Sequence, residues 1–273
     1  MKSTKIENAE QLVQNGGDMA AIAAAVARQQ QDKNYILLNK ELLPSKGKFY
    51  PDDIKVKKLS PIDLKNLSTM TANTIDGIMN STIAHCVSGI NVNDILIGDK
   101  FWFIFYLRQL TYNDMPFNIK YHCENCEKYG IYQMTFKDIQ TNYLADDFNT
   151  NVTLDNGDEI ELCFPTIGNE ITMNQMLREP EKYSVTGELD DQMLNIAFHI
   201  KKLNGKEISI MKAYEYITSG IDGYSFSTFC NAMADVNFGI KPYITIVCEK
   251  CNKEIYETVN ISPEYFLPKI KKA

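Results

Sequence analysis

Two cysteine pairs with the same internal spacing are the residues of this chain best suited to chemistry. Cys123 and Cys126 form one Cys-x-x-Cys pair, and Cys248 and Cys251 form the other. Two intervening residues let both sulfurs approach one ion from a tight turn, and four thiolates are the tetrahedral set that Zn²⁺ prefers in closed structural sites. The spacing therefore predicts a Cys₄ zinc site that holds the fold together and leaves no coordination position open for a substrate.

The elements that must position these thiols are two hairpins. One pair lies within FNIKYHCENCEKYGIYQMTF and the other within YITIVCEKCNKEIYETVNI, and both flanks of each pair are strand-like. An ordinary zinc ribbon has about 15–20 residues between its pairs, whereas residues 127–247 separate them here. We therefore expect a split ribbon with a subdomain inserted between its halves.

Other interpretations of the cysteines remain open. The pairs could lie on two independent surface hairpins with reduced thiols, or form a redox dithiol. A thioredoxin-type dithiol sits at a helix N-terminus, so strand-like flanks favour zinc. His122 could compete as a ligand, but strand alternation places it on the face opposite Cys123.

Composition narrows the class of protein. The chain has 273 residues and a net charge of −7, which argues against a nucleic-acid-binding ribbon with its usual basic patch. Cys86, Cys163 and Cys230 occur in apolar contexts typical of buried free thiols, so we expect a reducing compartment. We expect neither a signal peptide nor a membrane span, because the apolar run FWFIFYL at 101–107 is short and typical of a core helix.

No pattern of catalytic residues accompanies the cysteines. The three histidines, His85, His122 and His199, are scattered, and the chain has neither a Gly-x-Ser-x-Gly elbow nor a His-Glu-x-x-His motif. The pairs of neighbouring acids at 146–147 and 190–191 fit loop and helix-start positions. We therefore expect a protein that is not an enzyme.

Periodicity and turn residues predict an α+β protein: a mostly helical domain with short β-hairpins and the split Cys₄ unit. Gly47 suits a turn between two strands, and Asp155-Asn156-Gly157 suits the turn of a hairpin. The predicted units are a helical interaction arm at 1–33, strand-turn-strand plus helical core at 34–116, the split ribbon at 117–136 and 243–260, an inserted hairpin and helical subdomain at 137–242, and a basic tail at 261–273.

Two stretches of the first half carry a further signal. LLPSKGKFYP at 42–51 precedes a short strand, and 95–126 runs from an apolar helix into the first cysteine pair. In this order they resemble the baseplate hub protein family of T-even-like contractile-tailed bacteriophages, with its Leu-Pro-Ser-x-Gly-x-x-Tyr element and its aspartate-headed helix. The matching places are occupied by Asp99, Arg108, Tyr112, Cys123 and Cys126, whereas Cys248 and Cys251 rest on spacing alone.

The resemblance implies a structural or assembly component of the tail baseplate hub that binds other tail proteins. Such a protein is made in the host cytoplasm and belongs in the virion tail baseplate. The alternatives are a zinc-ribbon regulatory protein that binds nucleic acid or transcription machinery, and a zinc-free dithiol oxidoreductase. We also expect an ion pair between Asp99 and Arg108 to fix the core helix.

Overall fold

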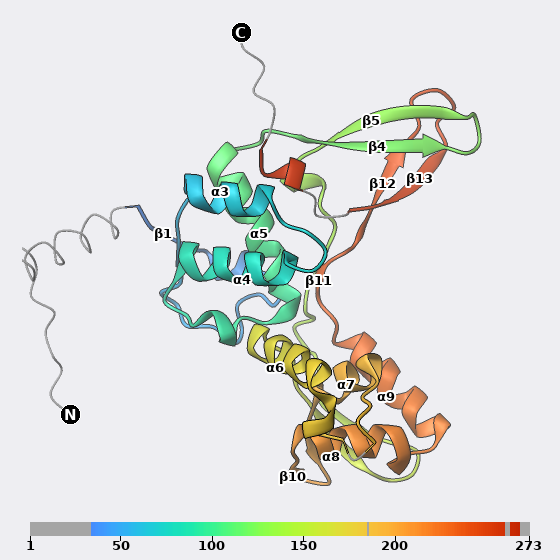
Figure 1. Ribbon diagram of the computed structural model, residues 1–273. Helices are drawn as coiled ribbons and strands as arrows, with labels where there is room; N and C mark the ends of the chain where they lie inside the picture. Colours follow the sequence, from blue (N-terminus) through green and yellow to red (C-terminus); the bar gives the residue numbers. More distant parts are fainter. Residues whose placement is uncertain (1–33, 185, 260–262, 268–273) are drawn as a thin grey trace, which may run out of the picture.

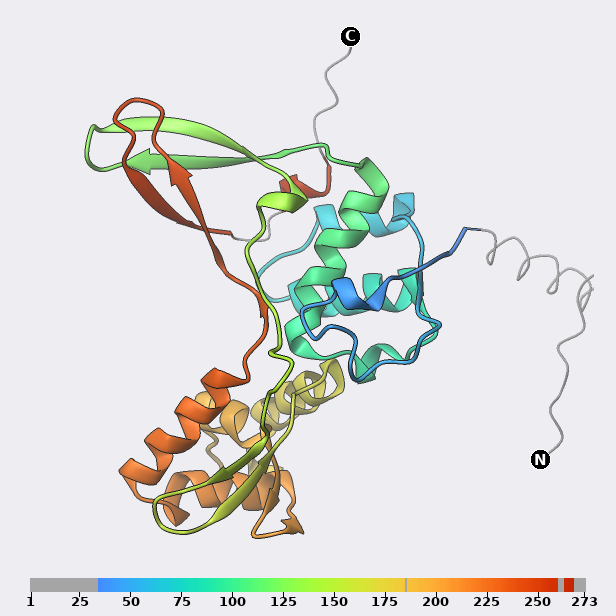
Figure 2. The same ribbon diagram turned by 180° about the vertical axis from the view of Figure 1, so that it is seen from behind.

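The computed structural model describes residues 34–184, 186–259 and 263–267. These residues form two lobes joined by a narrow waist, and a ribbon arm projects from the first lobe (Figure 1; Figure 2 shows the reverse side). The helical arm predicted at 1–33 lies outside the described residues, as does most of the predicted tail.

The first lobe combines a small sheet with a bundle of helices. The sheet has the order β1-β2-β3 and is antiparallel throughout. In chain order, the elements of the first lobe are β1 (Ile36–Leu37), η1 (Lys40–Leu42), β2 (Lys55–Val56), α3 (Pro61–Ser68), α4 (Ile75–Cys86), β3 (Val87–Ser88), η2 (Val92–Asp94) and α5 (Ile97–Tyr112).

Helix α5 is the centre of the first lobe. Five consecutive or near-consecutive apolar side chains on it are at most 3% exposed: Trp102, Phe103, Ile104, Phe105 and Leu107. Because they point to all sides of the helix, α5 is enclosed by its neighbours. The short apolar run at 101–107 is therefore a core helix, as the sequence predicts.

The second lobe carries its own sheet and core. The sheet order is β10-β9-β8-β7, all antiparallel, and Gly157 takes φ +88° in the predicted hairpin turn. In chain order, the elements of the second lobe are β7 (Asn151–Thr153), β8 (Glu159–Leu162), α6 (Ile167–Arg178), η4 (Pro180–Lys182), α7 (Asp191–Ala197), β9 (Ile200–Leu203), β10 (Lys206–Glu207), α8 (Ile210–Glu215), the π-helical turn η5 (Tyr216–Gly220) and α9 (Gly223–Asp235).

Two chain segments cross the waist side by side as β6 (Thr141–Asn142) and β11 (Gly239–Ile240). Phe49 contacts both Phe148 and Phe164, and Phe164 contacts Phe238, at ring-centroid distances of 5.9, 5.2 and 5.2 Å. The ammonium of Lys100, only 1% exposed, binds Asp76 of α4 and Glu170 of α6 at 2.8 and 2.7 Å. Aromatic packing and a buried ionic group thus join the lobes.

The α+β class is confirmed, but the expected predominance of helix is not. The described residues contain seven α-helices and five small antiparallel sheets, none wider than four strands. Several of these strands are only two residues long, too short for alternation of apolar and polar residues to reveal them.

The expected ion pair between Asp99 and Arg108 is wrong. The two residues are nine positions apart on α5, which places them about 13 Å apart along the helix axis. Asp99 accepts hydrogen bonds from the Ser45 N–H at 3.0 Å and the Tyr50 hydroxyl at 2.7 Å. Each charged residue therefore fixes a different part of the chain to the helix.

Arg108 holds the end of the described chain. Its Nε donates to the Tyr265 carbonyl at 2.6 Å and its Nη1 to the Met115 carbonyl at 2.8 Å. Tyr265 belongs to η6 (Pro263–Tyr265), and Phe266 beside it is fully buried. Residues 263–267, assigned to the tail by the sequence, therefore pack on the core of the first lobe.

Candidate metal centre

The ribbon arm consists of two hairpins whose tips carry the cysteines. β4 (Phe117–Cys123) pairs with β5 (Lys128–Met134), and β12 (Tyr243–Val247) pairs with β13 (Glu254–Thr258). Both views show the hairpins lying against each other (Figures 1 and 2). Each hairpin buries apolar side chains, which are Ile119 and Tyr121 on β4 and Ile244 and Ile246 on β12. Phe117, at the base of β4, packs instead against Phe105 of α5 and Tyr265.

The two tips turn in the same way. The residue after the second cysteine of each pair has a left-handed backbone, with φ of 55° at Glu127 and 56° at Asn252. Asparagine tolerates this conformation, whereas glutamate adopts it rarely. The absence of glycine at either position hides this shared turn from a reading of the sequence.

The four sulfurs converge on one point. The Sγ atoms of Cys123 and Cys251 are 3.6 Å apart, and those of Cys126 and Cys248 are 3.7 Å apart. All four lie within 4.8 Å of one another. A tetrahedron with metal–sulfur bonds of about 2.3 Å has edges of about 3.8 Å, whereas a disulfide needs about 2.05 Å. The donor set therefore fits a four-coordinate zinc ion.

The local electrostatics differ from thiol to thiol: burial raises the pKa of Cys126 to about 12, whereas that of Cys251 is lowered. The Asn125 side chain hydrogen-bonds to Cys251 and, with the Lys253 backbone N–H, lowers its pKa to about 6. Lys128 forms a 3.0 Å ion pair with Glu249, which links the two tips. Because zinc binds cysteine as thiolate, the lowered pKa of Cys251 favours a bound cation at that sulfur.

His122 does not join the cluster. Its Nε2 lies 3.2 Å from Glu127, and its ring stacks on Tyr129 at 4.3 Å on the outer face of the hairpin. This is the placement that strand alternation predicts. The remaining histidines lie elsewhere, with His85 on α4 and His199 just before β9, and so the three do not form a common site.

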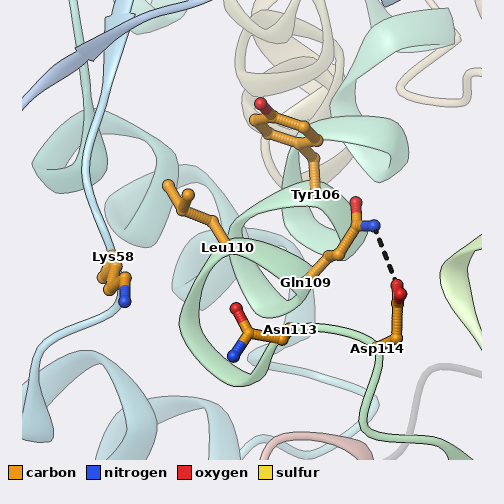
Figure 3. Close-up of a pocket in the computed structure, with 6 residues that line it drawn as sticks. All are labelled: Lys58, Tyr106, Gln109, Leu110, Asn113 and Asp114. Atoms are coloured by element: carbon orange, nitrogen blue, oxygen red, sulfur yellow. Dashed lines mark hydrogen bonds between the residues drawn. The ribbon is translucent and has the colours of Figure 1, made fainter.

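One open pocket is lined by a mixture of polar and apolar groups. It has a volume of about 540 Å³ and lies against the end of α5 (Figure 3), lined by Lys58, Tyr106, Gln109, Leu110, Asn113 and Asp114. Gln109 donates to Asp114 at 3.3 Å, and Asp114 also pairs with Lys137 at 3.2 Å. These groups satisfy one another, and no nucleophile or pair of acids converges there.

The fold and site together define an α+β protein with a closed, four-thiol cluster on a split hairpin unit. A family model described as T4 bacteriophage base plate protein matches residues 37–266. The chain therefore belongs to this family and is a structural component of a phage tail baseplate, as the resemblance implies. No curated protein and no solved structure matches the chain. None of the described helices combines the length and apolar character needed to cross a membrane.

Proposed function

We propose that this protein is a non-enzymatic structural or assembly component of the baseplate hub that works by binding other tail proteins. The match to the baseplate family over residues 37–266 carries this proposal. The closed geometry of the four thiols supports it, because four protein ligands leave a metal without an open position for chemistry.

In this proposal a zinc ion bound by Cys123, Cys126, Cys248 and Cys251 fixes the ribbon arm. The metal joins residues 117–136 to residues 243–260 and so closes the long insert at 137–242, which contains the second lobe. Structural zinc sites contribute on the order of 10 kcal/mol or more, comparable to the stability of a whole domain. The ion therefore holds the two ends of the insert in register.

The exposed side of the ribbon supports a role in protein contacts. Tyr129 and Ile131 alternate along β5 and are 77% and 58% exposed, and Tyr256 on β13 is 69% exposed. Exposed apolar side chains of this size are common where proteins bind one another. Residues 1–33 are a second proposed contact element, and assembly takes place in the reducing host cytoplasm.

The experiment is complementation in a phage that encodes this chain. Without the gene, electron microscopy should show tails with defective baseplates, and the wild-type chain should restore them. Cys251→Ser should restore them poorly, whereas Cys230→Ser, which changes a thiol outside the cluster, should act as wild type. Normal baseplates without the gene would overturn the proposed function.

Zinc content tests the structural ion separately. Protein purified without chelator should contain zinc by elemental analysis, and Cys251→Ser should lose one equivalent relative to Cys230→Ser. The alternative of a nucleic-acid-binding ribbon requires salt-dependent binding to DNA or RNA; neither the family nor the net charge of −7 favours it.

A further inference from the structure

A second group of metal-ligating side chains lies in the first lobe, apart from the ribbon. Asp63 on the first turn of α3 meets His85 and Cys86 at the end of α4. The His85 Nδ1 is 2.8 Å from Asp63 Oδ1, and the Cys86 Sγ is 3.6 Å from Asp63 Oδ2. One ligand atom from each of the three residues lies within 4.8 Å of the others. We call this group the Asp63 cluster.

Both oxygens of the Asp63 carboxylate face the cluster, Oδ2 toward Cys86 and Oδ1 toward His85, but only Oδ2 also serves the helix cap. Oδ2 accepts from the Ser60 N–H at 2.8 Å and the Ser60 hydroxyl at 2.6 Å, which completes the capping box of α3. Oδ1 faces His85. An ion bound through Oδ1 would therefore leave the helix cap in place.

Burial and access also suit an ion. Asp63 is 4% exposed and Cys86 is fully buried, while the His85 side chain is 44% exposed. The inner side of the cluster is thus dry, and its outer side is open to water. A divalent ion bound by one carboxylate, one thiolate and one neutral imidazole is electrically neutral, which limits the desolvation penalty of burying charge.

We propose that Asp63, His85 and Cys86 form a second zinc site, with water as the fourth ligand. The mixed oxygen, nitrogen and sulfur donors suit Zn²⁺, and the thiol excludes Mg²⁺ and Ca²⁺, which take oxygen ligands. Binding releases the thiol proton to solvent, and the neutral imidazole binds through Nδ1 with its single proton on Nε2. The ion would join the start of α3 to the end of α4.

The test is a Co²⁺ titration of the full chain purified with its ribbon zinc in place. Co²⁺ reports a bound thiolate through a sulfur-to-cobalt charge-transfer band. Wild type should develop this band and saturate at one added equivalent. His85→Ala should lose it, because an exposed imidazole can be removed without opening the core. Cys163→Ser, which alters a thiol elsewhere, should retain the band at wild-type intensity.

Fluorescence of the single tryptophan, Trp102, checks that His85→Ala keeps the first lobe folded. A folded His85→Ala chain with the band of wild type would overturn the proposal, because the cobalt would then be exchanging into the ribbon. Absence of the band from wild type would overturn it too. Neither outcome tests the ribbon site. That site is tested separately, by the zinc content of Cys251→Ser relative to Cys230→Ser.

Discussion

Tyr50→Phe removes one hydroxyl that serves two buried partners. The hydroxyl donates to Asp99 Oδ2 at 2.7 Å and accepts from the Leu96 N–H at 2.9 Å. Tyr50 is 6% exposed and Asp99 is fully buried, so water cannot readily replace the lost group. The variant leaves Asp99 with Ser45 as its remaining hydrogen-bond partner and leaves the Leu96 N–H unpaired.

The expected magnitude follows from these two losses. A hydrogen bond to a charged group contributes about 1.5–3 kcal/mol, and an unpaired buried donor costs about 1–3 kcal/mol. Allowing for relaxation around a single hydroxyl, we expect the first lobe to lose about 3 kcal/mol. With a urea dependence of about 2 kcal/mol per molar, its unfolding midpoint should fall by about 1.5 M.

Intrinsic fluorescence is the assay, because Trp102 is the single tryptophan of the chain and is 3% exposed on the same helix as Asp99. The matched control is Tyr129→Phe, since Tyr129 is 77% exposed. Its substitution should change the free energy of unfolding by no more than about 0.5 kcal/mol. Equal midpoints for the two variants would refute the reasoning.

The effect of Tyr50→Phe should also depend on pH. Burial raises the pKa of Asp99 above its usual range, and the hydrogen bonds from Ser45 and Tyr50 offset part of that increase. The folded state therefore holds the Asp99 proton more tightly than the unfolded state does. Lowering the pH through the folded pKa relieves the penalty of the buried charge, so the deficit of the variant should shrink in acid.

Three further outcomes are expected. Chelating the ribbon metal, or Cys251→Ser, should make the β4–β5 and β12–β13 hairpins sensitive to limited proteolysis; an unchanged cleavage pattern contradicts the structural role. Burial lowers the pKa of His199 to about 4, against about 6.5 when unfolded, so the second lobe should lose up to about 3 kcal/mol as pH falls from 6.5 to 4. In His199→Gln this acid-induced loss of stability should be absent, as measured by far-UV circular dichroism melts. A loss as large as that of wild type would speak against the role of His199. Arg108→Lys cannot reproduce both carbonyl contacts, so hydrogen exchange at Phe266 should accelerate by at least about tenfold; wild-type protection there counts against the clamp.

Local chemistry was readable from the chain. The two Cys-x-x-Cys pairs with strand-like flanks predict thiols at hairpin tips, and the Asp155-Asn156-Gly157 turn and the apolar run of α5 predict the elements found there. The motif at 42–51 likewise indicated the family. Each of these signals depends on residues close together in sequence, where spacing and backbone preference decide the geometry.

Contacts between distant segments were not readable in this way. The Leu-Pro-Ser-x-Gly-x-x-Tyr element binds Asp99 rather than leaving that carboxylate for Arg108, because helical geometry keeps the two charged residues far apart. The Asp63 cluster joins residues 22 positions apart through the packing of α3 on α4. No sequence pattern marks it, since a helix cap and an ordinary buried cysteine explain its members singly.

The sequence by itself determined which thiols could bind a metal, how each pair is presented, and which family the chain resembles, because short-range spacing fixes those properties. The tertiary structure alone decided that the thiols of the two distant hairpins meet, that two lobes meet at an aromatic waist, and that Arg108 holds the segment around Phe266. These depend on how buried surfaces from distant segments fit together, which no local pattern of residues encodes.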